Sequence, residues 1–358
     1  MTSQEDPKDF TWSEVLSRLI ASKDLNYDMA SWALEQILEG NASSAQIAGF
    51  VVALRSKGES VEEIKAMSDV MLAKARPIDL PREAVDIVGT GGDRARTVNI
   101  STMAAIVVAS AGAKVIKHGN RAASSACGTA DCLEALGIAL SISPEAQQTI
   151  FDRCSLVFLF APEYHSSLRH AAPARKDLGI STTFNFLGPL VNPARPRAQA
   201  IGVIDERMAQ LIAQVIAYRG DRGLVFCGMD GLDELTTTST SSIWMICEGQ
   251  IKRAQCDPQR LGIRRASVDD IRGGDAQLNA KIVKDLLDGA CGPIRDIVAL
   301  NAAAALCAYR GIDMEKDIHD QLAEPYQDAC EALSTHKAAL LLERWRQSCS
   351  ELEMQGKG

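Results

Sequence analysis

The sequence predicts a small all-helical N-terminal domain followed by a larger α/β domain with a largely parallel central sheet. Two observations support this fold class. Apolar residues recur at helical spacing through roughly the first eighty positions, and from Val85 onward short apolar runs alternate with helical stretches. Such alternation is typical of parallel sheets covered by helices. We therefore expect a helical domain over 1–80, to which 165–190 returns, and an α/β domain over 81–164 and 191–358.

Four amphipathic helices are expected in the first domain. Their apolar residues run through Trp12–Ile20, Met29–Leu38, Ile47–Leu54 and Ile64–Met71. Thr11 and Glu14 have the spacing of a capping box, and Ser60 and Glu63 repeat that spacing. Gly58 ends the third pattern, because glycine readily adopts the left-handed conformation that closes a helix. Helices of this kind usually form a core, and we assign no chemistry to them.

Five strands are expected in the second domain, each of them a short apolar run. They are Val85–Val88, Val115–Ile116, Val157–Phe160, Ile201–Ile204 and Leu224–Cys227. Further helices are expected at Met103–Ala113, after Gly273-Gly274-Asp275, from Pro293, and around Leu340–Trp345. Ligands of such sheets bind beyond the carboxyl ends of the strands, so the loops that follow these runs are expected to form a single site.

The composition disfavours several classes of protein. A formal net charge of −8 argues against general nucleic-acid binding. The ten cysteines form no Cys-x-x-Cys pair, so we expect reduced and mostly structural thiols. Residues 1–10 are polar and unlike a signal peptide, and no apolar run reaches the roughly 18 residues that cross a bilayer. We therefore expect a cytoplasmic protein that does not bind membranes.

The loop after the first strand has the features of an anion site. It contains Gly89, Gly91 and Gly92, and the polar stretch Asn99–Thr102 opens the helix that follows. Glycines let backbone N–H groups close on a phosphate, and a helix N-terminus adds partial positive charge. The loop has no Gly-Lys-Ser/Thr, which argues against an ATP-type P-loop. An ordinary tight turn would explain one or two glycines, but not three glycines with an aspartate and a hydroxyl cluster.

Three other stretches carry side chains suited to a polar substrate. Lys117–Arg121 combines two cations, an amide and a glycine, which suits phosphate and ribose, although a solvated basic loop is the alternative. Asp233 and Glu234 could hold Mg²⁺ in a loop expected to face solvent, although paired acids are often merely hydrated. Arg175 could bind a carboxylate bidentately or could be a surface ion-pair residue.

Taken together, these stretches resemble the anthranilate phosphoribosyltransferase family, from about residue 10 to 345. The family commonly reads Gly-Thr-Gly-Gly-Asp-Gly and then Asn-Ile-Ser-Thr in its glycine loop, followed by Lys-His-Gly-Asn-Arg and an Asp-Gly-x-Asp-Glu loop. Here Gly89–Thr102, Lys117–Arg121 and Asp230–Glu234 match those motifs. The chain departs from the family at Arg94, which replaces the common glycine, and Arg96 adds a second cation.

The resemblance implies a nucleoside-phosphorylase-like phosphoribosyltransferase fold and a pentosyltransferase of tryptophan biosynthesis. The amine of anthranilate would attack the anomeric carbon of 5-phosphoribosyl 1-diphosphate (PRPP), and pyrophosphate would leave with Mg²⁺, two ions being expected. It also implies a homodimer formed through the helical domain. No residue is assigned as catalytic. His118 is expected not to be an essential base, because an aromatic amine is already neutral at about pH 7.

The resemblance also assigns site residues. Those expected to bind PRPP are Gly89, Gly92, Asp93, Thr97, Asn99, Ile100, Ser101, Thr102, Lys117, His118, Gly119, Asn120, Arg121, Ala122, Ala123, Ser124, Ser125 and Thr129. Those expected to bind anthranilate are Gly89, Asn120 and Arg175. Those expected to hold metal are Ser101, Asp233 and Glu234.

Two alternatives remain open. The first is a pyrimidine-nucleoside phosphorylase of related fold, which uses free phosphate and would not need the pair Asp233 and Glu234 or Arg175. The second is a non-catalytic nucleic-acid-binding relative, which should have a basic surface that the net charge of −8 disfavours.

Overall fold

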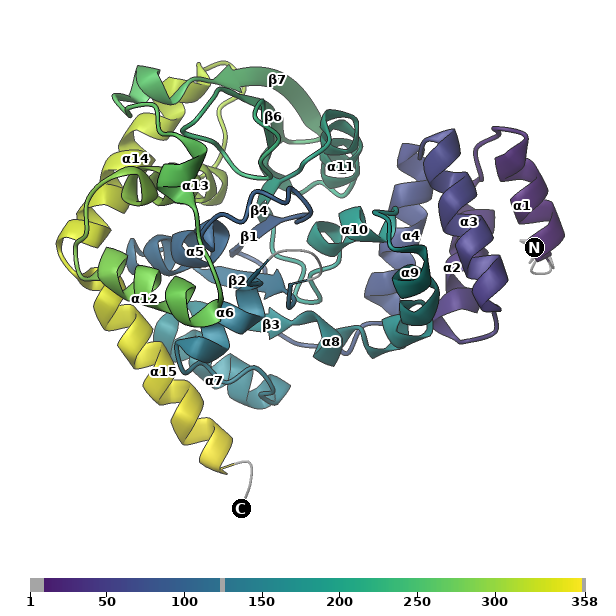
Figure 1. Ribbon diagram of the computed structural model, residues 1–358, viewed down its shortest axis with the longest axis horizontal. Helices are drawn as coiled ribbons and strands as arrows, with labels where there is room; N and C mark the ends of the chain where they lie inside the picture. Colours follow the sequence, from purple (N-terminus) through teal and green to yellow (C-terminus); the bar gives the residue numbers. More distant parts are fainter. Residues whose placement is uncertain (1–9, 123–125, 356–358) are drawn as a thin grey trace, which may run out of the picture. The chain divides into compact units, whose positions relative to one another are not determined.

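The computed structural model describes residues 10–122 and 126–355, and its chain divides into two compact units (Figure 1). One unit comprises Met1–Ala75 and His165–Leu187, and the other comprises Arg76–Tyr164 and Gly188–Gly358. The first is helical and the second contains the sheet, so the predicted fold class is confirmed.

From residue 10 onward, the helical unit contains four main helices and three short ones. They are α1 (Trp12–Ile20), α2 (Tyr27–Leu38), α3 (Ser44–Lys57), α4 (Val61–Ala73), the 3₁₀ helix η1 (Ser166–His170), α9 (Ala172–Leu178) and α10 (Phe184–Leu187). The two predicted capping boxes are present at the starts of α1 and α4. Within the unit, the hydroxyl of Thr183 donates to Glu59 at 2.7 Å and the guanidinium of Arg55 lies over the ring of Phe186. These contacts attach the returning segment to the first helices.

The second unit is organised by a seven-stranded sheet with the order β3-β2-β1-β4-β5-β6-β7. Its strands are β1 (Val85–Gly89), β2 (Val115–Gly119), β3 (Leu156–Phe160), β4 (Ala198–Gly202), β5 (Arg222–Gly228), β6 (Ser241–Cys247) and β7 (Gln250–Cys256). Strands β1 to β5 pair in parallel, whereas β6 and β7 extend the sheet in antiparallel fashion. The carboxyl ends of the parallel strands therefore lie along one edge.

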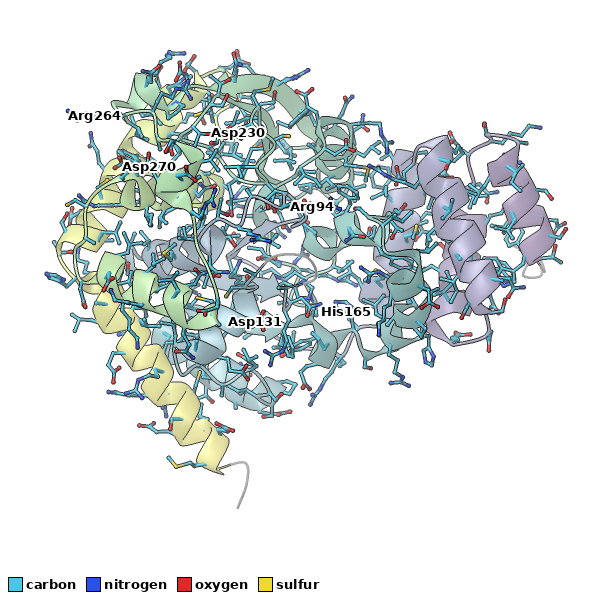
Figure 2. The ribbon with its side chains drawn as sticks, viewed as in Figure 1. Arg94, Asp131, His165, Asp230, Arg264 and Asp270 are labelled. Atoms are coloured by element: carbon cyan, nitrogen blue, oxygen red, sulfur yellow. The ribbon has the colours of Figure 1, made fainter. Side chains whose placement is uncertain are left out.

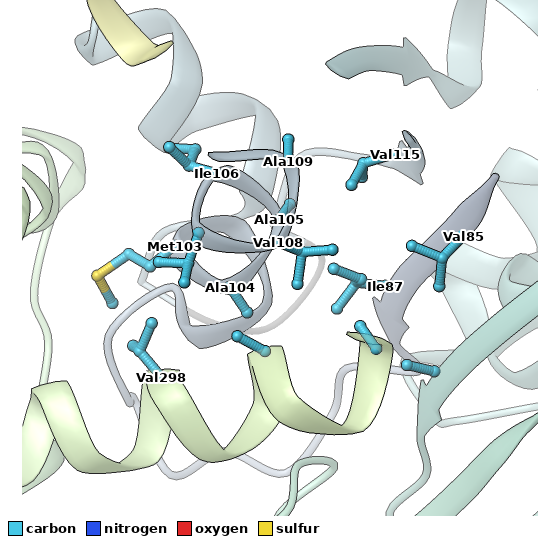
Figure 3. Close-up of a cluster of buried hydrophobic side chains, with 14 of the residues drawn as sticks. Val85, Ile87, Met103, Ala104, Ala105, Ile106, Val108, Ala109, Val115 and Val298 are labelled. Carbon is cyan, nitrogen blue, oxygen red and sulfur yellow. The ribbon is translucent and has the colours of Figure 1, made fainter. Parts of the chain in front are cut away.

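Helices cover this sheet, and α5 and α13 are buried over most of their length. The longer helices are α5 (Ile100–Ser110), α6 (Thr129–Ala135), α7 (Pro144–Cys154), α11 (Glu206–Tyr218), α12 (Ala276–Leu287), α13 (Pro293–Arg310), α14 (Ile318–Ser334) and α15 (Lys337–Gln355). The short ones are α8 (Ala161–Tyr164) and the 3₁₀ helices η2 (Gly188–Leu190), η3 (Pro258–Leu261) and η4 (Val268–Ile271). Figure 3 shows Met103 and Val108 of α5, Val298 of α13 and Ile87 of β1 in one buried cluster. This cluster holds α5 against the strand that precedes it.

The second unit differs from the sequence prediction at one strand, and it contains elements that were not predicted. The fourth strand is Ala198–Gly202 rather than Ile201–Ile204, because it aligns residue for residue with β1. The hairpin of β6 and β7 and the helix α14 were not expected. None of the ten cysteines is joined to another in a disulfide, all ten lying in the described ranges. In the ranges that the structure describes, no helix is long and apolar enough to cross a membrane.

Candidate phosphoribosyl-diphosphate site

Two of the predicted loops touch each other at the carboxyl edge of the sheet. The backbone N–H of Gly91, in the loop after β1, donates to a carboxylate oxygen of Asp233, in the loop after β5, at 2.7 Å. A Cβ on Gly89 would lie 2.1 Å from that oxygen, and one on Gly202 would lie 1.7 Å from the Asp233 carbonyl oxygen. Both positions therefore require glycine for the loops to approach this closely.

The start of α5 and a buried lysine join the same cluster. The backbone N–H of Ser101 donates to the carboxylate of Glu234. The ammonium of Lys117, in the middle of β2, donates to the hydroxyl of Ser101 at 3.1 Å and to the carbonyl oxygen of Ile87. Residues from β1, β2, α5 and the loop after β5 thus meet in one place, as the positions of the loops predicted.

Asp233 is buried, so the expectation that its loop faces solvent was wrong at this residue, although Asp230 and Gly231 are exposed. Asp233 is only 8% exposed, and its neighbours Leu232 and Leu235 lie in the core and draw the carboxylates inward. Burial, and then the Asp93 carboxylate, raise the pKa of Asp233; burial and Asp233 raise the pKa of Glu234. Burial lowers the pKa of Lys117, while Asp86, Glu234 and Asp233 oppose that shift.

The oxygen atoms of this cluster suit a hard cation that takes its remaining ligands from water and substrate. Across residues 10–122 and 126–355, no three histidine, cysteine or acidic side chains are placed to hold a metal by themselves. Mg²⁺ usually takes one or two protein carboxylates and completes its shell with water and substrate phosphates. The carboxylate of the buried Asp233 repels that of Glu234, to which the backbone N–H of Ser101 donates. A divalent cation would remove that repulsion.

The loop after β2 is fixed by a buried carboxylate. The backbone N–H of His118 donates to Asp86 at 3.1 Å, and the Asn192 amide donates to the other oxygen of Asp86 at 2.8 Å. The ring Nδ1 of His118 lies 3.3 Å from the carbonyl oxygen of Gly188. Gly119 and Asn120 follow at the strand end, where Asn120 is exposed.

Further along this loop, Arg121 is engaged with acids of the protein. Its guanidinium lies 2.9 Å from the carboxylate of Asp131 and 2.9 Å from that of Glu134. The charge of Arg121 is therefore already paired within the protein and is not free for a phosphate. The backbone N–H of Ala122 donates to Asp131 at 3.1 Å. Thr129 begins α6, and its hydroxyl accepts from Thr102 at 3.4 Å. The predicted site residues Ala123, Ser124 and Ser125 lie outside the described residues.

The remaining predicted residues of the glycine loop lie between its glycines and α5. Gly92 is exposed, and Asp93 accepts from the backbone N–H of Ala95 at 3.1 Å. Thr97 forms an antiparallel bridge with Arg272. Ile100, the first residue of α5, is buried in the core beneath the loop.

Two buried asparagines that the sequence analysis missed hold the loops. Asn279 of α12 donates to the Asn99 side-chain oxygen at 2.8 Å and accepts from the Gly274 N–H at 2.8 Å. Asn301 of α13 accepts from the backbone N–H of Leu235 at 2.9 Å and donates to its carbonyl at 2.8 Å. Each lies on a helix far along the chain, and only the pair of glycines before α12 indicated a close approach.

Arg175 lies on α9, in the helical unit. It is half-buried, its guanidinium lies 5.5 Å from the ring centre of Phe184, and burial lowers its pKa. Within the described part of the chain its side chain has no acidic partner. A desolvated guanidinium of this kind favours a carboxylate ligand.

Comparisons with known proteins agree on one family. A family model described as "Glycosyl transferase family, a/b domain" matches residues 81–339, and one described as "Glycosyl transferase family, helical bundle domain" matches residues 13–75. The anthranilate phosphoribosyltransferase of an Arthrobacter species is 53% identical over 335 residues, which cover 94% of this chain and 95% of the relative. That of Thermobifida fusca is 51% identical over 338 residues, covering 94% and 97%.

Solved structures give the same result. The anthranilate phosphoribosyltransferase of Thermus thermophilus matches with a TM-score of 0.86 and 37% identity, over 94% of this chain and 99% of the other. The enzyme of Saccharomyces cerevisiae, solved in complex with PRPP and Mg, matches with a TM-score of 0.83 and 27% identity, over 97% and 100%.

Proposed function

This chain belongs to the anthranilate phosphoribosyltransferase family, and we propose that it transfers the phosphoribosyl group of PRPP to the amine of anthranilate, releasing pyrophosphate. The observation that carries the proposal is the cluster of Gly91, Ser101, Lys117, Asp233 and Glu234 at the carboxyl edge of the sheet. It combines backbone donors, a cation and paired carboxylates, which a diphosphate with its metal requires.

In this proposal, the glycine loop and the N-terminus of α5 bind phosphate oxygens through backbone N–H groups. The ammonium of Lys117 supplies positive charge beneath the bound phosphates. Asp86, which is 0% exposed, accepts a hydrogen bond from the backbone N–H of His118 and so fixes the strand β2 that carries Lys117 and His118. Substrate held in this way reacts mainly because it is positioned and because the departing charge is stabilised.

The protein's own groups also suggest how metal takes part. Asp233, Glu234 and the hydroxyl of Ser101 would hold Mg²⁺, and we propose two ions. When bound, Mg²⁺ neutralises charge on the departing diphosphate. Burial raises the pKa of both carboxyls, to which the Asp93 carboxylate adds at Asp233 and the Asp233 carboxylate adds at Glu234, and a cation that offsets this charge supports the assignment.

Arg175 is the proposed partner of the anthranilate carboxylate. Its support is that the guanidinium is half-buried and lacks an acidic partner in the described ranges. A planar guanidinium matches a carboxylate bidentately, whereas a lysine would not. We also propose that the protein works in the cytoplasm as a homodimer formed through its helical domain.

A substrate-exchange experiment tests the proposed function against the phosphorylase alternative. The purified chain is mixed with PRPP and Mg²⁺, and pyrophosphate release is followed before and after anthranilate is added. We expect release that depends on anthranilate and that disappears when EDTA is present. A parallel reaction contains uridine and inorganic phosphate. Cleavage of uridine, with no release of pyrophosphate in the first reaction, would establish the phosphorylase instead.

A further inference from the structure

Two arginines in the glycine loop adopt a backbone conformation that arginine normally avoids. Arg94 has φ 58° and Arg96 has φ 56°, both in the left-handed region. Side chains with a Cβ are disfavoured there, whereas glycine is not. Arg94 occupies the position where the family motif commonly has glycine, so the chain carries a charged side chain where none is needed for the turn. Strained residues of this kind concentrate at functional sites.

The loop's conformation is held by hydrogen bonds that do not involve the side chains of Arg94 and Arg96. The N–H of Ala95 donates to the Asp93 carboxylate at 3.1 Å. The carbonyl of Arg96 accepts from the N–H of Gly273 at 2.8 Å, and the N–H of Val98 donates to Ile271 at 3.0 Å. The turn is therefore fixed on both sides of each arginine, and the guanidinium groups make no contribution to it.

Both guanidinium groups are also available to a ligand. Arg94 and Arg96 are exposed, and neither side chain makes a hydrogen bond or ion pair with any residue that the structure describes. Nearby arginines differ: Arg272 lies 2.7 Å from Asp269, and Arg121 lies 2.9 Å from both Asp131 and Glu134. Figure 2 labels Arg94 on the loop that follows β1.

The charge around the site explains why such groups would matter. The glycine loop and the acidic loop contribute Asp93, Asp233 and Glu234, against which the interior offers the cation of Lys117. The whole chain has a net charge of −8. A substrate with several phosphate charges would be repelled unless local cations reverse the potential at the entrance.

We propose that Arg94 and Arg96 are additional PRPP-binding residues, whose guanidinium groups bind phosphate oxygens and raise the rate of substrate capture. This inference rests on the proposed function, because it needs PRPP as the substrate. Arg94 would then bind phosphate at a position where the glycine of the family motif has no side chain to do so.

The test compares two double variants and one single variant by steady-state kinetics and thermal unfolding. Arg94→Gly with Arg96→Gly removes the charges and relieves the strain, and Arg94→Lys with Arg96→Lys keeps the charges. Arg195→Gly is the matched control, because Arg195 is an exposed arginine with φ 50° in the loop before β4. The kcat and KM for both substrates are measured at low and high ionic strength.

We expect the double glycine variant to raise the KM for PRPP by about tenfold or more, with kcat and the KM for anthranilate within about threefold. Its Tm should not fall, because glycine relieves the left-handed strain. The kcat/KM for PRPP should lose much of its dependence on ionic strength. The double lysine variant should retain most of the wild-type affinity for PRPP.

The inference is overturned if the double glycine variant changes the KM for PRPP no more than Arg195→Gly does. It is also overturned if the double lysine variant is as impaired as the double glycine variant, because charge would then not be the cause. A wild-type chain that fails to use anthranilate would instead refute the proposed function, so the two failures are distinguishable.

Discussion

Replacing Asn279 by alanine should damage both stability and PRPP binding, although Asn279 lies on α12 and outside the predicted site. The side chain is 1% exposed and makes two hydrogen bonds of 2.8 Å, one to the Asn99 side chain and one from the Gly274 N–H. Asn99 in turn donates to the carbonyl of Cys127 at 3.2 Å. Asn279 therefore links the start of α5 to the segment that precedes α12.

The magnitude follows from these contacts. Each neutral hydrogen bond contributes about 1 kcal/mol net, and a buried group left without a partner costs about 1–3 kcal/mol. Loss of both bonds to Asn279 should therefore lower the free energy of unfolding by about 2–4 kcal/mol. Because Asn99 would lose its fixed orientation, the KM for PRPP should rise by about tenfold.

Denaturant unfolding and steady-state kinetics measure the two effects separately. Asn279→Asp keeps an oxygen that accepts from Gly274 but loses the donor to Asn99, so it should affect the KM more than stability. His319→Ala is the control, because the buried imidazole of His319 accepts from the backbone N–H of Asp257 at 2.9 Å, outside the site. If Asn279→Ala unfolds like the control and leaves the KM for PRPP unchanged, the positioning argument fails.

Four further variants test other parts of the site. Asp233→Asn with Glu234→Gln should nearly abolish turnover and its dependence on Mg²⁺, because the oxygen ligands lose their charge. Arg175→Ala should weaken anthranilate binding by about 10- to 100-fold, the loss of about 1.5–3 kcal/mol from a charge-assisted hydrogen bond, and affect PRPP less. His118→Ala should lower kcat less than Asp233→Asn does, with no ionisation lost at about pH 6.5. Burial raises the pKa of Asp86 from 3.8 to about 6. The protonated carboxyl of Asp86 therefore stabilises the fold fully below its unfolded pKa, and this contribution is lost as pH rises through about 6. The free energy of unfolding of the wild type, relative to that of Asp86→Asn, should fall by about 3 kcal/mol between about pH 4 and 7.

Each of these outcomes can be contradicted by a specific result. Wild-type Mg²⁺ dependence in the double carboxylate variant would exclude the metal assignment. Calorimetry that finds equal losses for both ligands in Arg175→Ala would argue against a carboxylate partner. A larger loss in His118→Ala than in Asp233→Asn, with an ionisation removed, would make His118 the base. Parallel pH profiles of unfolding for wild type and Asp86→Asn would mean that Asp86 titrates normally.

Local patterns predicted much of the fold. The capping boxes at Thr11 and Ser60, the Asp275 cap of α12 and the proline that begins α13 all act within one turn, so the sequence was sufficient to predict them. Helix α14 was missed because Pro325 lies inside it, and proline usually ends a helix. Strand β7 was missed because it lies at the sheet edge and is largely exposed, so it has no apolar run.

The loops of the site could be predicted from the sequence, but the buried side chains that hold these loops in place could not. Glycines and paired acids follow their strands directly, which local patterns can reveal. The partners of Asn99 and Leu235 come from Asn279 and Asn301, whose roles depend on how α12 and α13 pack. The burial of Asp233 likewise depends on leucines on either side entering the core, which the polar composition of the loop concealed.

The most direct test of the whole account is the loss of anthranilate fluorescence in a mixture of the chain, anthranilate, PRPP and Mg²⁺. Fluorescence should decrease steadily only when all four components are present. Replacing PRPP by ribose 5-phosphate, or adding EDTA, should stop it. Fluorescence that stays constant with the folded wild-type chain, over a range of Mg²⁺ concentrations, would contradict the assignment of this site to phosphoribosyl transfer.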